Sequence, residues 1–107
     1  MSLELEQALK EIASERARQD AMWGGAGHDD NHGCDDWFDY IEHQIYQIRE
    51  EWDGEDTDKV RRAYIKIAAL ACAALESYDR RLAAGQEPTE NRFHSQHPTL
   101  TNVEAKS

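Results

Sequence analysis

One short stretch of this chain concentrates side chains that bind metals or carry protons. Residues 23–37 read WGGAGHDDNHGCDDW, with two histidines, four aspartates and one cysteine between two tryptophans. Imidazole together with carboxylate suits Zn²⁺, Mn²⁺ or Fe²⁺, and carboxylates alone suit Mg²⁺. The same composition fits a solvated connector whose aspartates form turns and cap helices. Both interpretations stay open, because His-Asp-Asp-x-His matches no strict ligand spacing.

An acidic pair further along the chain extends the candidate metal site. Glu76 and Asp79 are three residues apart, so they share one face of a helix. In an antiparallel hairpin that turns near residue 55, they lie close to the end of the 23–37 stretch. We expect this cluster to bind a divalent ion, Mg²⁺ or Mn²⁺, weakly if at all. Its candidate ligands are His28, Asp29, Asp30, His32, Asp36, Glu76 and Asp79.

The segments around this stretch predict three main helices, because apolar residues recur at helical spacing. Ser2 can cap the first helix, and Asp35 or Asp36 can cap the second. Glycines after Trp23 end the first helix, and Gly85 closes the third. We expect the connector between the first two helices to be ordered. The predicted helices are 3–22, 35–53 and 57–84.

The third predicted helix is apolar on most of its circumference. Its segment IAALACAAL is rich in small residues, which is typical of a helix closely surrounded by others. We predict an all-α domain over residues 1–85 that completes a four-helix or larger bundle as a homodimer. Residues 86–107 are expected to be a polar tail or a dimer arm. Residues expected in the core or at close helix contacts are Trp37, Trp52, Tyr64, Ala71, Cys72, Ala74, Tyr78 and Leu82.

The charge balance narrows the classes of partner. The chain has 107 residues and a formal net charge of −10, so it repels a phosphate backbone and direct nucleic-acid binding is disfavoured. No apolar run has membrane-spanning length, and the N-terminus lacks a signal-peptide pattern. Two cysteines suggest no disulfide framework, so a cytoplasmic protein is expected.

Three segments, ERARQDAMWGG…HDD, DDWFDYI and KIAALACAALESYDRR, resemble small, phage-type members of the all-α NTP pyrophosphatase (MazG-like) superfamily over roughly residues 11–82. The resemblance implies binding of an NTP or dNTP, or its hydrolysis to a monophosphate and pyrophosphate. It also implies Mg²⁺ held by E-x-x-E on one helix and E-x-x-D on the next. In the register set by Trp37 and residues 68–70, none of the four positions is a carboxylate, so a diverged and inactive member is an open alternative. The four positions hold Gln44, Gln47, Ala63 and Lys66.

Other interpretations come from different classes of protein. The acidic face and the dimer groove suit a non-enzymatic module that binds a protein partner, and a structural dimer without ligand also fits. Trp23, at the edge of the polar stretch, is the tryptophan most open to stacking on a ligand. The arginines at 16, 18, 80 and 81 favour surface salt bridges over phosphate contacts.

Overall fold

The computed structural model describes residues 1–90, and this part of the chain is helical with no strand. The all-α class is therefore confirmed, and the three long helices lie within two residues of their predicted ranges. A short fourth helix, α2, was not predicted. No helix within residues 1–90 is long and apolar enough to span a membrane. The helices are α1 (Leu3–Trp23), α2 (Ala26–Asp29), α3 (Cys34–Glu51) and α4 (Thr57–Ala83).

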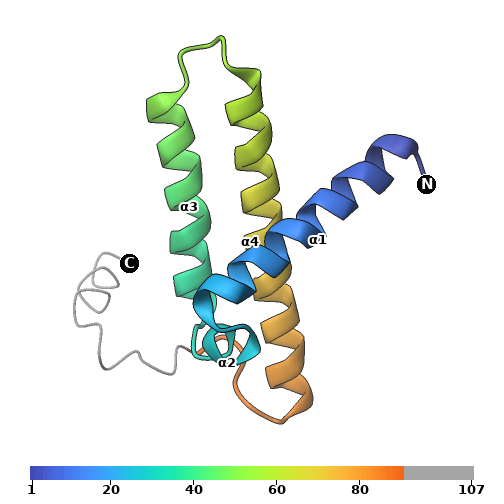
Figure 1. The fold of residues 1–107 in the computed structure, drawn as a ribbon. Helices are drawn as coiled ribbons and strands as arrows, with labels where there is room; N and C mark the ends of the chain where they lie inside the picture. Colours follow the sequence, from blue (N-terminus) through green and yellow to red (C-terminus); the bar gives the residue numbers. More distant parts are fainter. Residues whose placement is uncertain (91–107) are drawn as a thin grey trace.

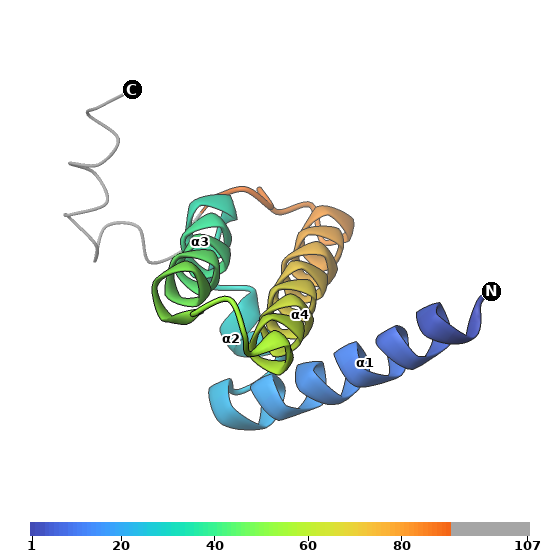
Figure 2. The ribbon, with the colours of Figure 1, turned by 90° about the horizontal axis from the view of Figure 1, so that it is seen from above.

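Helix α4 is the element on which the others pack. It forms an antiparallel hairpin with α3, and α1 crosses it obliquely (Figure 1). Seen from above, α1 lies on one side of the hairpin and α2 lies beneath it, near the start of α3 (Figure 2). The N-terminal half of α1 extends beyond the hairpin. The 23–37 stretch therefore lies where three helices meet.

The helix ends follow the local sequence. The Ser2 hydroxyl accepts a hydrogen bond of 3.0 Å from the Leu5 amide, as predicted. Gly24 ends α1 with φ of 102°, in the left-handed region that favours glycine. The predicted cap of α3 was wrong, because Gly33 occupies the N-cap and no side chain caps the helix. Asp35 and Asp36 lie in the first turn instead, where their charge suits the helix dipole.

The core of the single chain is small. Trp37 from α3 packs against Leu70 and Ala73 of α4 and is 5 % exposed, with two half-buried residues, Ile41 and Ala74, beside it. The predicted core role of Trp37 is confirmed. Several large apolar side chains of α3 and α4 nevertheless stay exposed, among them Phe38, Tyr46, Tyr64, Leu75 and Leu82.

Several residues predicted to be buried are exposed in this chain. Trp52 is 46 % exposed because it ends α3, where the hairpin opens into the turn. Tyr64 is 69 % exposed because it lies on the side of α4 away from both α1 and α3. Ala71 lies on that same side and is exposed. Tyr78 and Leu82 of α4 are exposed as well. The prediction that these five side chains are buried is therefore wrong for the single chain.

The exposed side of α4 carries a continuous apolar stripe. Its members recur at alternating steps of four and three residues, the spacing of a helix–helix seam. An apolar hollow of about 300 Å³ adjoins the stripe and includes Trp37 and Phe38 of α3 in its lining. The stripe, which we call the α4 stripe, consists of Tyr64, Ala68, Ala71, Leu75, Tyr78 and Leu82.

Candidate functional site

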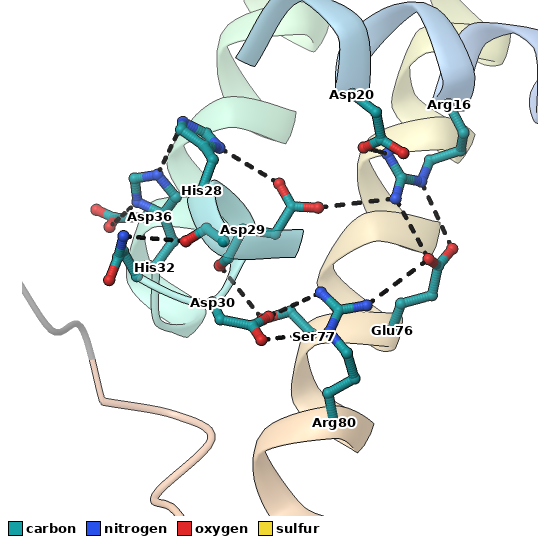
Figure 3. A network of polar contacts seen from close by, with 12 residues as sticks. Arg16, Asp20, His28, Asp29, Asp30, His32, Asp36, Glu76, Ser77 and Arg80 are labelled. Carbon is teal, nitrogen blue, oxygen red and sulfur yellow. Dashed lines mark hydrogen bonds and ion pairs between the residues drawn. The ribbon is translucent and has the colours of Figure 1, made fainter. Parts of the chain in front are cut away.

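The polar stretch between α1 and α3 is ordered, as predicted. Gly24 and Gly25 turn the chain out of α1 with positive φ, and α2 then takes up the middle of the stretch. The Ser77 hydroxyl of α4 is buried and donates a hydrogen bond of 3.2 Å to the Asp29 carbonyl oxygen. This bond fixes α2 against α4, and the acidic side chains of the stretch gain fixed positions (Figure 3).

Two arginines lie among the acidic side chains of the predicted metal site. Arg80 Nη2 is 2.7 Å from Asp30 Oδ1, and Glu76 Oε1 lies 3.3 Å from Arg16 Nη2 and 4.0 Å from Arg80 Nη1. The hydrogen bond from Arg80 holds the pKa of the Asp30 carboxyl below its ordinary value, against the effect of burial. The expected mutual repulsion of bare carboxylates is therefore relieved by Arg16 and Arg80 (Figure 3).

The predicted ligands separate into two groups. Asp30 and Glu76 belong to the arginine network, and Asp79 is exposed and takes no part in it. Within residues 1–90, no group of three or more His, Cys, Asp or Glu residues has an arrangement that holds a metal ion. The remaining four predicted ligands form a linear chain of contacts.

That chain of contacts runs from one aspartate to another through two imidazoles. Asp29 Oδ1 lies 3.3 Å from His28 Nδ1, His28 Nε2 lies 3.3 Å from His32 Nε2, and His32 Nδ1 lies 2.8 Å from Asp36 Oδ2. The two rings meet edge to face, with centroids 4.7 Å apart. Asp29 is buried, and its second oxygen faces Arg16 Nη2 at 3.7 Å. We call this unit, Asp29, His28, His32 and Asp36, the histidine pair.

Arg81 is a structural residue that sequence analysis assigned to the surface. Its guanidinium is buried and donates hydrogen bonds to the carbonyl oxygens of His32, Glu87 and Glu90, at 2.7, 2.6 and 2.6 Å. The Cys34 amide also donates to the Thr89 carbonyl oxygen at 3.2 Å. The first residues of the predicted tail are therefore fixed against the start of α3, while residues 91–107 lie outside the described part of the chain. The sequence feature that could have indicated this role is that Arg81 is a basic residue in the last turn of a helix.

An aromatic pocket lies beside the histidine pair. It has a volume of about 300 Å³ and is lined by Trp23, His28, Tyr40, His43, Gln44 and Leu70. Burial, together with Asp36 and Asp39, raises the pKa of Tyr40 above its ordinary value. Trp23 is partly exposed at the rim, 6.0 Å from the His28 ring between centroids. The pocket offers flat apolar walls together with imidazole and amide groups.

A second hollow lies between α3 and α4, next to the aromatic pocket. The four positions aligned with the MazG-like metal ligands, Gln44, Gln47, Ala63 and Lys66, line one cleft of about 90 Å³. Lys59 and Arg62 also line the cleft, with Glu51 as its one acid. Within residues 1–90, none of the three basic side chains forms an ion pair of 4.0 Å or less.

Gln44 lines both hollows, so the aromatic pocket and the basic cleft are adjoining parts of one groove. We call this the α3–α4 groove. Comparisons of the chain with protein-family models, with curated proteins and with solved structures find no match.

Proposed function

We propose that the protein binds a nucleotide in the α3–α4 groove, with the base in the aromatic pocket and the phosphates in the basic cleft. The observation that carries this proposal is that Gln44 lines both hollows. A nucleotide needs a flat apolar surface next to a cationic one, and the groove offers the two side by side. Tyr40 and Gln47 are seven residues apart on α3, so the two parts are separated by roughly 10 Å along the helix.

The three basic side chains of the cleft are the second support for this proposal. Lys59, Arg62 and Lys66 line a cleft with a single acid, Glu51. Arg62 and Lys66 also line a hollow on the α1 side together with Glu11 and Glu15. Three basic groups at one cleft attract an anion, and phosphate oxygens accept charge-assisted hydrogen bonds from them.

The cleft does not fit the Mg²⁺ ion that the MazG-like resemblance implies. Gln44 and Gln47 offer neutral amide oxygens, Ala63 offers no ligand, and the Lys66 ammonium repels a cation. The proposal is therefore nucleotide binding without a divalent ion in this cleft. Pyrophosphohydrolase chemistry of the MazG-like kind is not part of it.

Calorimetric titration in EDTA tests the two parts of the groove separately. Lys66→Glu is expected to weaken ATP and tripolyphosphate binding by roughly 10- to 100-fold, because a charge-assisted hydrogen bond is lost. Adenosine binding should stay unchanged. Trp23→Ala is expected to weaken ATP and adenosine by about 5- to 100-fold through lost stacking, with no change for tripolyphosphate.

Lys10→Glu is the matched control, since it makes the same charge reversal on the exposed N-terminal half of α1. It should bind ATP like the unchanged protein. Absence of binding for every NTP and dNTP tested would rule out the proposal. ATP binding that requires added Mg²⁺ would show that the phosphates are not held by the basic cleft.

We further propose that the protein is a homodimer in which two copies of the α4 stripe pack antiparallel. In the register that places Ala71 opposite Leu75, Ala68 lies opposite Tyr78, so small residues face large ones at the centre of the seam. Tyr64 then lies opposite Leu82 at its ends. Leu75 is 62 % exposed in the single chain. In a two-fold symmetric dimer each contact occurs twice, so the Leu75 side chain of both copies is covered. The small core of one chain is the physical reason to expect this partner. A module that binds a different protein through the same stripe is the competing interpretation.

Sedimentation velocity tests the dimer. Leu75→Glu is expected to weaken self-association by at least roughly 100-fold, because each dimer loses two buried leucine contacts. Tyr46→Glu is the charge-matched control, since Tyr46 is exposed on α3 outside the α4 stripe. If the unchanged protein sediments as a monomer at tens of micromolar concentration, the homodimer proposal fails, and the α4 stripe would have to bind a different protein.

A further inference from the structure

We infer that the histidine pair is a binding site for a divalent transition-metal ion of the Zn²⁺ or Co²⁺ class, with His28 Nε2 and His32 Nε2 as the two protein ligands. The inference is independent of nucleotide binding, since it concerns the junction of α2 and α3. It narrows the sequence-based expectation, which left Zn²⁺, Mn²⁺, Fe²⁺ and Mg²⁺ open among seven candidate ligands, to two imidazole nitrogens.

The distance between the two imidazoles carries the inference. Their Nε2 atoms lie 3.3 Å apart, a separation that also suits an N–H···N hydrogen bond between the rings. A tetrahedral zinc ion with Zn–N bonds of about 2.0–2.1 Å separates two nitrogen ligands by roughly 3.3–3.4 Å. The two nitrogens therefore lie at the separation that one shared metal ion requires.

The outer nitrogen of each ring has the partner that metal-bound histidines use. Nδ1 of His28 and Nδ1 of His32 each face a carboxylate oxygen, from Asp29 and Asp36 respectively. In the tautomer in which Nδ1 donates to the carboxylate, Nε2 of the same ring is free to ligate a metal ion. A carboxylate behind each ligating histidine is the usual second shell of a zinc site.

Burial of the pair suits an open metal site. His32 and the two aspartates are largely buried, whereas the His28 side chain is 34 % exposed. Metal can therefore enter beside His28, which also lines the aromatic pocket. Two protein ligands leave at least two positions for water or for a molecule held in that pocket. Nitrogen ligands favour Zn²⁺ and Co²⁺ over Mg²⁺.

Titration of the metal-free full-length protein with Co²⁺, followed by its visible absorption, tests the site. Saturable binding with a 1:1 ratio of metal to chain is expected, with displacement by Zn²⁺ and none by excess Mg²⁺. The variants His28→Ala and His32→Ala should each abolish the Co²⁺ spectrum. Asp36→Asn should weaken binding by about 10- to 100-fold, because it removes the carboxylate behind His32.

Two controls keep the result interpretable. The variant His94→Ala with His97→Ala removes the histidines beyond the described residues, and Co²⁺ binding should persist in it. His28→Ala affects a partly exposed side chain, so circular dichroism should show an intact fold. Binding that survives loss of both His28 and His32 would overturn the inference. Absence of Co²⁺ and Zn²⁺ binding would also overturn it, and would mean that the two rings share only a proton.

Discussion

Trp37→Ala is expected to lower the free energy of unfolding by about 3–5 kcal/mol, the cost of emptying a buried aromatic site. Trp37 is 5 % exposed and packs against Leu70 and Ala73, so its ring joins α3 to α4. Few other buried apolar side chains exist in residues 1–90 to compensate for its loss. A small domain has roughly 5–15 kcal/mol of stability in total, so much of the variant should be unfolded at 37 °C.

Urea denaturation followed by circular dichroism measures this loss. Trp52→Ala is the control, because it removes the same side chain from a position that is 46 % exposed. Its effect should be clearly smaller. Equal losses for the two variants would mean that Trp37 is not the residue that holds the hairpin together.

Arg81→Met is expected to lower the free energy of unfolding by about 2–4 kcal/mol. The guanidinium is 3 % exposed and donates to the carbonyl oxygens of His32, Glu87 and Glu90. Each hydrogen bond from a charged group contributes about 1.5–3 kcal/mol, but the 86–90 segment can turn toward water when the guanidinium is lost. Methionine keeps the apolar stem and removes every donor.

Proteolysis and denaturation distinguish this role from a general effect of charge. In Arg81→Met, residues 86–90 should become accessible to protease before the helices unfold. Arg80→Met is the neighbouring control, and it should cost only about 0–1 kcal/mol, because the Arg80–Asp30 pair is partly exposed. A resistant 86–90 segment in Arg81→Met would show that other contacts fix it.

Periodicity predicted the long helices because each one has an apolar face to bury. The sequence could not predict what covers that face. Trp37 and Trp52 have the same helical spacing, yet only Trp37 meets α4 at a depth where Leu70 and Ala73 surround it. Tyr64 likewise has core spacing and is exposed, because no helix of the same chain lies on its side of α4.

For the candidate sites too, the sequence could not predict which residues pack against each other. The sequence located the polar stretch correctly, but the roles of its acids depend on residues about fifty positions away. Asp30 meets Arg80, and the Asp29 carbonyl oxygen meets Ser77. Such long-range partners leave no local pattern. His28 and His32 were recognisable as a pair four residues apart, whereas the facing of their Nε2 atoms follows from the α2 turn, which was not predicted.

The attachment of α1 gives the molecule one element that is held mainly by charge. Gln19 is its only buried residue, and its links to α4 include Glu11–Arg61 at 2.7 Å and Arg16–Glu76 at 3.3 Å. Hydrogen bonds from Arg61 and Gln7 lower the pKa of Glu11 to about 2. Dissolved salt screens such pairs and leaves the contacts of Trp37 unaffected. We therefore expect high ionic strength to loosen the α1 arm while the α3–α4 hairpin stays closed.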